Sequence, residues 1–312
     1  MTKYLITGAA GFIGSNLAEH LIQQGDEVVG VDNFLAGKRV NIAAFENSMQ
    51  FVEGDIRDAV LLKALCEGVD YVLHHGAMAS VPWSMEAPAL AHDHNVTGTL
   101  NVLLAARDAG VKKIVMAVTS AVYGNTQTLP VHEELPTQLL SPYAATKLMG
   151  EMYIKLFSDI YQLPAVGLRY FNVFGKHQDP SSAYAAAIPI FARKLIRNES
   201  PTVFGDGTQT RDFVYIKDVI QANIKACTSP DSVNGEVFNV GTGIQITVNE
   251  LVAHMQQLLG TDLPVIHGDE RQGDVRHSVA SIEKARRVLG YAPEYSVFEG
   301  LKEAIDWYRL NL

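Results

Sequence analysis

The stretch KYLITGAAGFIG, from Lys3 to Gly14, joins a short apolar run to three glycines that are spaced three residues apart. The run predicts a buried strand, and Gly8, Gly11 and Gly14 predict a tight turn that opens a helix. In such a turn the first glycine permits the bend, the second lets a pyrophosphate approach the backbone, and the third lets the helix pack on the strand. The helix N-terminus adds free N–H groups and partial positive charge. An ordinary glycine-rich strand–helix connection would share this pattern, so the rest of the chain must decide between them.

Segments of helical and of strand-like pattern alternate after this turn. Ile13, Leu17 and Leu21 recur every four residues, which predicts a helix that ends at Gly25. Short apolar runs predict strands at 3–7, 26–33, 49–55, 69–77, 112–120, 164–173 and 235–243. This alternation predicts an α/β fold, a Rossmann-like doubly wound parallel sheet with a smaller mixed α/β substrate-binding lobe. We expect residues 1–171 to form the first domain and 172–312 the second lobe, with the segment 213–242 returning to the first sheet.

The end of the second predicted strand carries Asp32. A carboxylate there can accept hydrogen bonds from the ribose hydroxyls of an adenosine, and it would repel a 2′-phosphate. We therefore expect NAD rather than NADP, and the nearby Lys38 and Arg39 weaken that preference only slightly. Asp55 and Ile56, after the third predicted strand, are candidates for the edge of the adenine pocket.

Composition excludes several classes of partner. The chain has 312 residues, 47% of them hydrophobic, and a net charge of −9, which argues against a nucleic-acid or anionic-membrane surface. The apolar run at the N-terminus is too short for a signal peptide, and no other run approaches a membrane span. Two cysteines, Cys66 and Cys227, form no disulfide framework, so we expect a reducing, cytoplasmic location. The ten histidines include the pairs at 74–75 and 92–94, but they form no closed ligand set, and we expect no metal site.

A tyrosine and a lysine four residues apart occur in SPYAATKLMGE, from Ser141 to Glu151. Tyrosine has a pKa of about 10, so its ionisation at neutral pH costs about 4 kcal/mol. Lys147 would lie one helical turn from Tyr143 and, with the positive ring of NAD⁺, could provide that stabilisation. Thr119 and Ser120 end the fifth predicted strand, and their hydroxyls could relay a proton. A solvated helix face is the alternative interpretation, but the dinucleotide turn favours a proton-and-hydride site.

The ordered set TGAAGFIG, VDN, GDIRD, HHGA, TSAVYG, YAATK, LRYFNVFG, RDFVYIKDV, FNVGTG and RQGD covers nearly the whole chain. It resembles the extended short-chain dehydrogenase/reductase superfamily and, within it, the UDP-hexose 4-epimerases. The resemblance implies that Tyr143 acts as the base, Lys147 tunes it, and Thr119 relays the proton. The cofactor residues that it implies, together with those above, are Gly8, Gly11, Phe12, Ile13, Gly14, Asp32, Asn33, Asp55, Ile56, Gly76, Ala77, Asn95, Tyr143, Lys147 and Tyr170.

The same resemblance implies a set of substrate-binding residues. Val203 and Phe204 would flank a uracil, Arg211 and Arg271 would bind the phosphates, and Asp274 would bind the ribose. Two arginines in separate loops could clamp a diphosphate, although an isolated arginine is by default a surface ion-pair residue. The remaining members of the set are Ser80, Val81, Thr119, Ser120, Asn172, Ala187, Ile188 and Ser278.

Departures from related patterns narrow the expected reaction. Sugar-nucleotide 4,6-dehydratases have Asp and Glu after the relay threonine, and the related UDP-glucuronate decarboxylases keep a glutamate at the second of these positions. This chain has Ser120 and Ala121, so the resemblance leaves epimerisation. Most of these epimerases have a serine at the Thr119 position, and Ser120 is an alternative relay. The stretch 175–189 resembles epimerases that accept 2-acetamido sugars, and Ser278 stands where a bulky tyrosine excludes the N-acetyl group in some relatives.

We therefore expect a UDP-sugar 4-epimerase that interconverts UDP-GlcNAc and UDP-GalNAc, and UDP-Glc and UDP-Gal, through a transient 4-keto intermediate with bound NAD. The alternatives are a 4-epimerase of another sugar nucleotide such as UDP-glucuronate, a net NAD(P)-dependent oxidoreductase, and a non-enzymatic dinucleotide sensor. A sensor would have no use for the Tyr143–Lys147 pair. The apolar helices expected at 94–110 and 143–161 could pair across a two-fold axis, which predicts a homodimer.

Overall fold

A seven-stranded sheet forms the centre of the protein in this computed structural model, which describes residues 1–179, 186–270 and 275–311. The strand order is β11-β6-β5-β4-β1-β2-β3, and each neighbouring pair is parallel. The strands are β1 Lys3–Thr7, β2 Glu27–Asp32, β3 Gln50–Glu53, β4 Tyr71–His74, β5 Lys113–Thr119, β6 Ala165–Tyr170 and β11 Val237–Val240. The chain crosses from β3 back past β1 to β4, so a crevice opens at the carboxyl ends of β1 and β4. The expected Rossmann-like fold class is confirmed.

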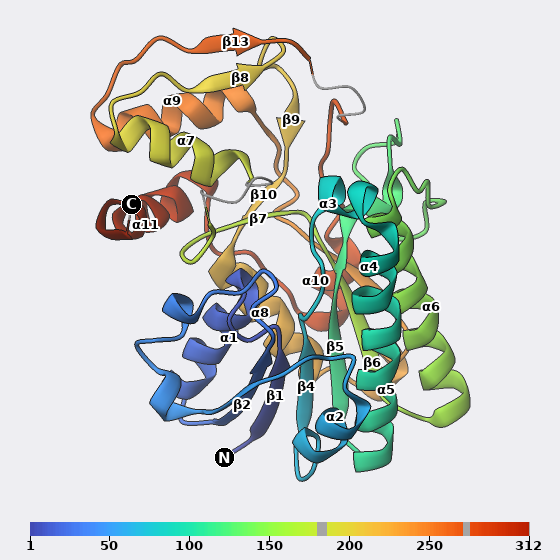
Figure 1. Cartoon of the computed structure of the whole chain (residues 1–312). Helices are drawn as coiled ribbons and strands as arrows, with labels where there is room; N and C mark the ends of the chain where they lie inside the picture. The colour runs from blue at the N-terminus through green and yellow to red at the C-terminus, as the bar shows by residue number, and fades with distance from the viewer. Residues whose placement is uncertain (180–185, 271–274, 312) are drawn as a thin grey trace.

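Helices cover both faces of this sheet (Figure 1). One face packs against α2 Ala59–Leu65, α5 Gly98–Ala109 and α6 Pro142–Tyr161, and the other packs against α1 Phe12–Gln23 and α8 Ile216–Cys227. Successive side chains of β5 point to opposite faces of the sheet. Val115 belongs to the core under α1 and α8, while Met116 belongs to the core under α6. Two short helices, α3 Val81–Glu86 and α4 Pro88–His92, lie beside α6.

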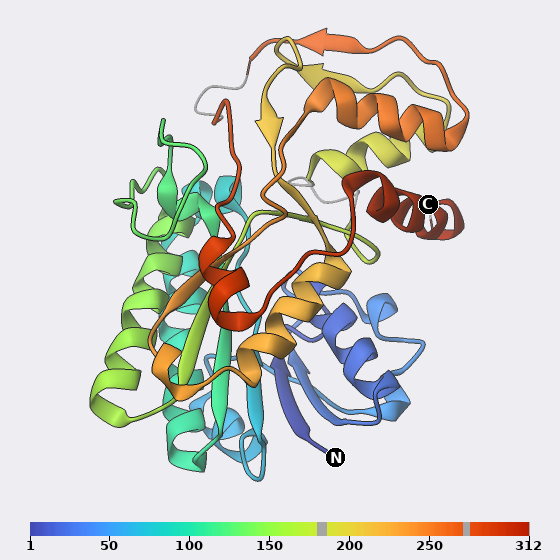
Figure 2. The same cartoon turned by 180° about the vertical axis from the view of Figure 1, so that it is seen from behind.

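The smaller lobe lies beyond the carboxyl ends of the strands (Figures 1 and 2). Its helices α7 Ala187–Ile196, α9 Val248–Leu259 and α11 Val297–Asn311 pack on one another, and a short parallel pair is formed by β8 Thr202–Phe204 and β13 Ile266–Gly268. Two further pairs join β9 Thr210–Arg211 to β12 Ile246–Thr247, and β7 Asn172–Phe174 to β10 Phe213–Tyr215.

The chain passes between the lobes more than once. After β10 it enters α8 on the large sheet and then β11, which pairs with β6 through contacts such as Phe238 opposite Leu168. The helix α10, Glu283–Leu289, packs beside β11 and α8 (Figure 2). The segment 213–242, which we expect to return to the first sheet, does not include α10, because the short apolar pattern of this helix does not indicate which surface it covers. The exact domain boundary at residue 171 stays a prediction.

Candidate active site

The predicted glycine turn lies between β1 and α1, and two of its glycines occupy positions that a larger residue could not. Gly8 has φ +72°, and a Cβ on it would lie 2.7 Å from the backbone nitrogen of Gly76. A Cβ on Gly14 would lie 2.1 Å from the carbonyl oxygen of Gly8, so the third glycine is needed for close packing of α1 on the turn. Gly11 is the N-cap of α1 and provides no side-chain cap, which leaves the helix N-terminus accessible to an anion. This cradle fits the pyrophosphate of a dinucleotide.

Thirteen of the fifteen predicted cofactor residues line one cavity of about 280 Å³ beside this turn. They are Gly8, Gly11, Phe12, Ile13, Gly14, Asp32, Asn33, Ile56, Gly76, Ala77, Tyr143, Lys147 and Tyr170. The cavity lies in the crevice at the carboxyl ends of β1 and β4, where open α/β sheets bind their ligands.

Asp32 is fixed at the adenosine end of the cavity. Its Oδ2 accepts a hydrogen bond from the Ala10 backbone at 2.9 Å, and its Oδ1 accepts one from the Phe34 backbone at 2.7 Å. Burial raises the pKa of this carboxyl, and the backbone donors oppose that effect. Each oxygen keeps a lone pair for a ribose hydroxyl.

The two cations near Asp32 are held in ion pairs. Lys38 pairs with Asp179 at 2.5 Å, and Arg39 pairs with Glu46 and Glu53. Neither cation is therefore an uncommitted partner for a 2′-phosphate.

Two predicted cofactor residues do not line the cavity. Asp55 accepts a hydrogen bond from Asn33 at 2.8 Å, while Arg57 binds both of its oxygens and holds its pKa well below the usual range. Asn95 is buried, and its amide is used by the backbone of Met78 and by other protein groups. A contact of either residue with the cofactor stays a prediction.

Tyr143 lies in the first turn of α6, where the Ser141 side chain caps the helix and Ser84 accepts a hydrogen bond from the Tyr143 backbone at 3.0 Å. Burial raises the pKa of the phenol, and the hydrogen bond from Thr119 lowers it. The Thr119 hydroxyl accepts from the backbone of Ala121 at 3.1 Å, so its proton is available to donate to the phenol. Thr119, rather than Ser120, is thus the hydroxyl that contacts Tyr143.

Lys147 is buried one turn further along α6, and its Nζ donates to the carbonyl oxygen of Ala117 at 3.0 Å. Burial lowers the pKa of this amine to about 8. We expected Lys147 to lower the pKa of Tyr143, but in the protein alone burial outweighs every other influence on the phenol. The arrangement nevertheless places a titratable phenol, a hydroxyl donor and an ammonium beside one cavity, as acid–base chemistry requires.

His75 lines the same cavity, and we did not predict it as a site residue. Its Nε2 lies 3.0 Å from the hydroxyl of Tyr170, which also bonds to the side chain of Asn223. Burial lowers the pKa of His75 to about 3, so the ring is neutral. The only sequence signal was its position beside Gly76, and a histidine at the end of a strand more often has a structural role.

The predicted substrate residues that the structure describes do not line this cavity, and they come from elements of both lobes. Ser80 caps α3 and Val81 begins it, Ser120 follows β5, Asn172 begins β7, and Ala187 and Ile188 form the first turn of α7. Val203 is buried in the core, while Phe204 is 39% exposed. The expectation that Val203 and Phe204 flank a uracil stays a prediction.

Arg211 and Ser278 lie together in the small lobe. The Arg211 guanidinium donates to the Thr210 carbonyl at 2.8 Å, and the same carbonyl accepts from the Ser278 backbone at 3.2 Å. Asp212, which we did not single out, holds this region through hydrogen bonds from Thr242, Gly243 and Ala280. Arg271 and Asp274 lie outside the described residues.

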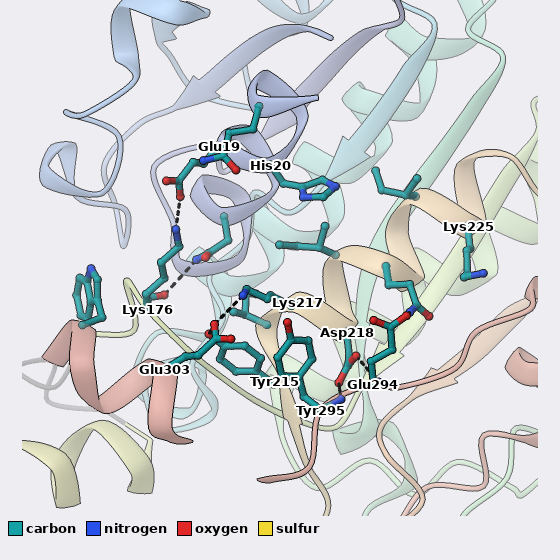
Figure 3. A pocket seen from close by; sticks show the side chains of 17 residues that line it. Glu19, His20, Lys176, Tyr215, Lys217, Asp218, Lys225, Glu294, Tyr295 and Glu303 are labelled. Atoms are coloured by element: carbon teal, nitrogen blue, oxygen red, sulfur yellow. Dashed lines mark hydrogen bonds and ion pairs between the residues drawn. The ribbon is translucent and has the colours of Figure 1, made fainter. Parts of the chain in front are cut away.

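A larger cavity of about 620 Å³ lies between α1, α8 and α11, and none of the predicted site residues lines it (Figure 3). Two of its lysines are held in ion pairs, Lys176 with Glu19 and Lys217 with Glu303. It has no base beside a glycine turn, so we assign the chemistry to the smaller cavity.

Within the described part of the chain, no group of three or more His, Cys, Asp or Glu side chains is arranged to hold a metal ion. The same residues include no helix of the length and apolarity that a membrane crossing requires.

The sequence of a putative UDP-glucose 4-epimerase from Methanocaldococcus jannaschii is 40% identical over 98% of both chains. A UDP-glucuronate 4-epimerase from Thermodesulfobacterium geofontis is 36% identical over 100% of this chain and 98% of its own.

Solved structures agree closely with this fold. A UDP-glucose 4-epimerase from Thermotoga maritima, in complex with UDP-glucose, superposes with a TM-score of 0.94 at 36% identity and covers 99% of both chains. A UDP-N-acetylglucosamine 4-epimerase from Methanobrevibacter ruminantium, in complex with UDP-N-acetylmuramic acid, gives 0.95 at 36% identity over 100% of this chain and 99% of its own. The model of the NAD dependent epimerase/dehydratase family matches residues 4–241. With its glycine turn, Asp32 and buried Tyr143–Lys147 pair, this chain belongs to the NAD dependent epimerase/dehydratase family.

Proposed function

We propose that the protein is a UDP-sugar 4-epimerase with tightly held NAD. The observation that carries this proposal is the shared cavity, which is lined by the glycine turn, Asp32, Tyr143 and Lys147. Relatives of 36–40% identity over nearly the whole chain are named as UDP-sugar 4-epimerases, which supports the same reaction class.

Tyr143 is the base that takes the proton of the sugar 4-hydroxyl, and Thr119 donates a hydrogen bond that stabilises the phenolate. NAD, when bound, supplies reversible hydride transfer at the sugar carbon. Lys147 holds a positive charge near the base and anchors α6 to β5 through Ala117. Tyr143 then returns the proton, so the protein ends the cycle unchanged and no external reductant is needed.

For the sugar, we propose that 2-acetamido substrates are accepted. Ser278 is a small residue beside Arg211 in the small lobe, so this position leaves room for an N-acetyl group. The named relatives include epimerases of glucose, N-acetylglucosamine and glucuronate nucleotides, so UDP-GlcNAc, UDP-Glc and UDP-GlcA are the substrates to compare.

The experiment is incubation of the purified protein with each of these three nucleotides, with the C4 epimers resolved by NMR. Turnover of UDP-GlcNAc together with UDP-Glc is expected. Turnover of UDP-Glc alone would contradict the argument from Ser278, and turnover of UDP-GlcA alone would support the alternative substrate. Turnover that depends on added NAD(P) in stoichiometric amounts would instead indicate a net oxidoreductase.

We further propose a homodimer that forms through α6. Four apolar side chains on this helix, Met149, Met152, Leu156 and Ile160, are exposed by 41–62% and lie along one stripe. A symmetric pair of such helices would bury the stripe of both copies. The two cysteines are buried free thiols, which supports our proposal of a cytoplasmic location.

A further inference from the structure

A chain of buried hydrogen bonds runs from the glycine turn to helix α6, and His74 lies at its centre. His74, at the end of β4, is 1% exposed and does not line the cofactor cavity. Its Nδ1 lies 2.7 Å from the hydroxyl of Thr7, the last residue before Gly8, and its Nε2 lies 2.9 Å from the hydroxyl of Thr99 on α5.

The surrounding donors fix the direction of each bond. The Thr7 oxygen already accepts from the backbone N–H groups of His75 at 3.2 Å and Gly76 at 3.0 Å. Its own proton must therefore be donated to His74 Nδ1, which makes that nitrogen an acceptor. A neutral imidazole then carries its proton on Nε2 and donates it to Thr99, and the Thr99 hydroxyl donates to the carbonyl oxygen of Asn95 at 2.6 Å.

Asn95 continues the chain to the catalytic helix. Its Oδ1 accepts from the Met78 backbone at 2.8 Å, which orients the amide so that Nδ2 donates to the Thr146 hydroxyl at 3.0 Å. Thr146 donates to the carbonyl oxygen of Tyr143 at 2.9 Å. Every bond in the chain is at most 3.2 Å long, and the second proton of the Asn95 amide is donated to the carbonyl oxygen of Met78 at 3.1 Å.

We propose that His74, held as the neutral Nε2–H form, is a positioning residue that fixes the first turn of α6, and hence Tyr143, relative to the glycine turn. This inference rests on the proposed function only for its effect on catalysis. Only the neutral Nε2–H form accepts from Thr7 while it donates to Thr99, because a protonated ring has no acceptor and the other tautomer has its proton on Nδ1. Burial and the positive charge of Lys147 lower the pKa of His74 and keep the ring in this neutral form.

The test uses Thr99→Val, an isosteric change that removes the hydroxyl linking His74 to the Asn95 carbonyl and leaves the cavity lining intact. Val115→Ala is the control, because Val115 is a buried residue in the core on the opposite face of the sheet. Hydrogen exchange by mass spectrometry reports on the amide of Lys147, which α-helical geometry pairs with the Tyr143 carbonyl. We expect exchange of this amide to be about 10-fold faster in Thr99→Val and unchanged in Val115→Ala. Equal protection in Thr99→Val and the wild type would overturn the proposal, and so would equal loss in the control.

NMR of the imidazole nitrogens gives a second readout that needs no catalysis. A proton on Nε2 that does not titrate between about pH 5 and 9 is expected. A proton on Nδ1, or a titrating ring, would overturn the assignment whether or not the protein proves to be an epimerase.

The kinetics of Thr99→Val then test whether the chain of hydrogen bonds affects the proposed reaction. Since a small misplacement of a catalytic group is costly, we expect kcat to fall about 10-fold in Thr99→Val with KM unchanged. A higher KM with an unchanged kcat would contradict the positioning role. An inactive wild type would refute the proposed function, while the exchange and NMR outcomes would still decide the positioning role.

Discussion

The Nζ of Lys147 donates to the carbonyl oxygen of Ala117 at 3.0 Å, which ties helix α6 to strand β5. Thr119 lies two residues further along the same strand, so this bond fixes the position of α6, which carries Tyr143 and Lys147, relative to Thr119. The lysine thus has a structural task in addition to its charge, and a substitution there should affect both.

Removal of the phenol should abolish turnover without loss of the nucleotide. For Tyr143→Phe we expect kcat to fall by about 10²–10⁴, the usual contribution of general acid–base catalysis. Tyr153→Phe, on the same helix but packed against Phe157, should keep full activity. NMR turnover assays and titration with UDP would check both, and full activity in Tyr143→Phe would exclude the mechanism.

Lys147 should make stability depend on pH. The pKa of its amine is lowered to about 8 in the folded protein, so between about pH 8 and 10.5 the unfolded chain binds more protons than the native one. The free energy of unfolding should therefore gain a positive contribution as pH rises through this window, and Lys147→Met should lack it. Urea unfolding at pH 7.5 and 9.5 measures the free energy of unfolding of the wild type and of Lys147→Met. An equal change between the two pH values in both proteins would contradict the lowered pKa of Lys147.

Asp32 should control affinity for the cofactor. In Asp32→Ser we expect NAD to bind about 10-fold to 100-fold more weakly, because a charged acceptor of ribose hydrogen bonds is lost. NADP should not replace it, since Lys38 and Arg39 are engaged in ion pairs. Calorimetric titration of the cofactor-depleted protein measures both affinities, and tight NADP binding would show that these pairs open readily.

The buried pair of Arg169 and Glu151 should dominate local stability. Arg169 donates to both Glu151 oxygens, at 2.8 and 2.6 Å, and also to the hydroxyl of Tyr123 at 2.8 Å. Glu151→Gln leaves a buried guanidinium without its counter-ion, which should cost about 3–5 kcal/mol in the free energy of unfolding. Chemical denaturation provides the measurement. The double variant Glu151→Leu/Arg169→Met should recover most of the loss.

The stripe on α6 should determine the oligomeric state. We expect Met152→Lys/Ile160→Lys to be a monomer by light scattering after size exclusion, because four lysines would face one another in the paired helices. Val60→Lys, at an exposed position of α2, is the control that should leave the mass unchanged. A monomeric wild type would contradict the dimer directly.

The parts of the fold that follow from local physics were predictable. Gly8 and Gly14 could be interpreted from their spacing alone because no side chain fits where they lie. The end of the first helix at Gly25, which has φ +82°, follows from the same steric rule. Asp32 was identifiable because a carboxylate at the end of a strand has few structural uses.

Features that depend on packing between distant segments were not predictable. Val203 is buried within the small lobe, where it pairs with His267 of the distant strand β13. Nothing in the sequence shows that the amide of Asn95 is consumed by Met78 and Thr146, since these residues are brought together only by the fold. His75 enters the cavity because β4 ends one residue before it.

Strand β11 completes the large sheet by pairing with β6, and Val237 is 67 residues downstream of Tyr170. During translation at about 5–20 residues per second, the ribosome needs roughly 3–13 s to make that interval. Throughout this period the nascent chain carries β6 as an open edge with unpaired backbone groups, a template for wrong pairing. Biogenesis of this enzyme therefore includes an interval in which a chaperone that covers the edge of β6 would prevent wrong pairing.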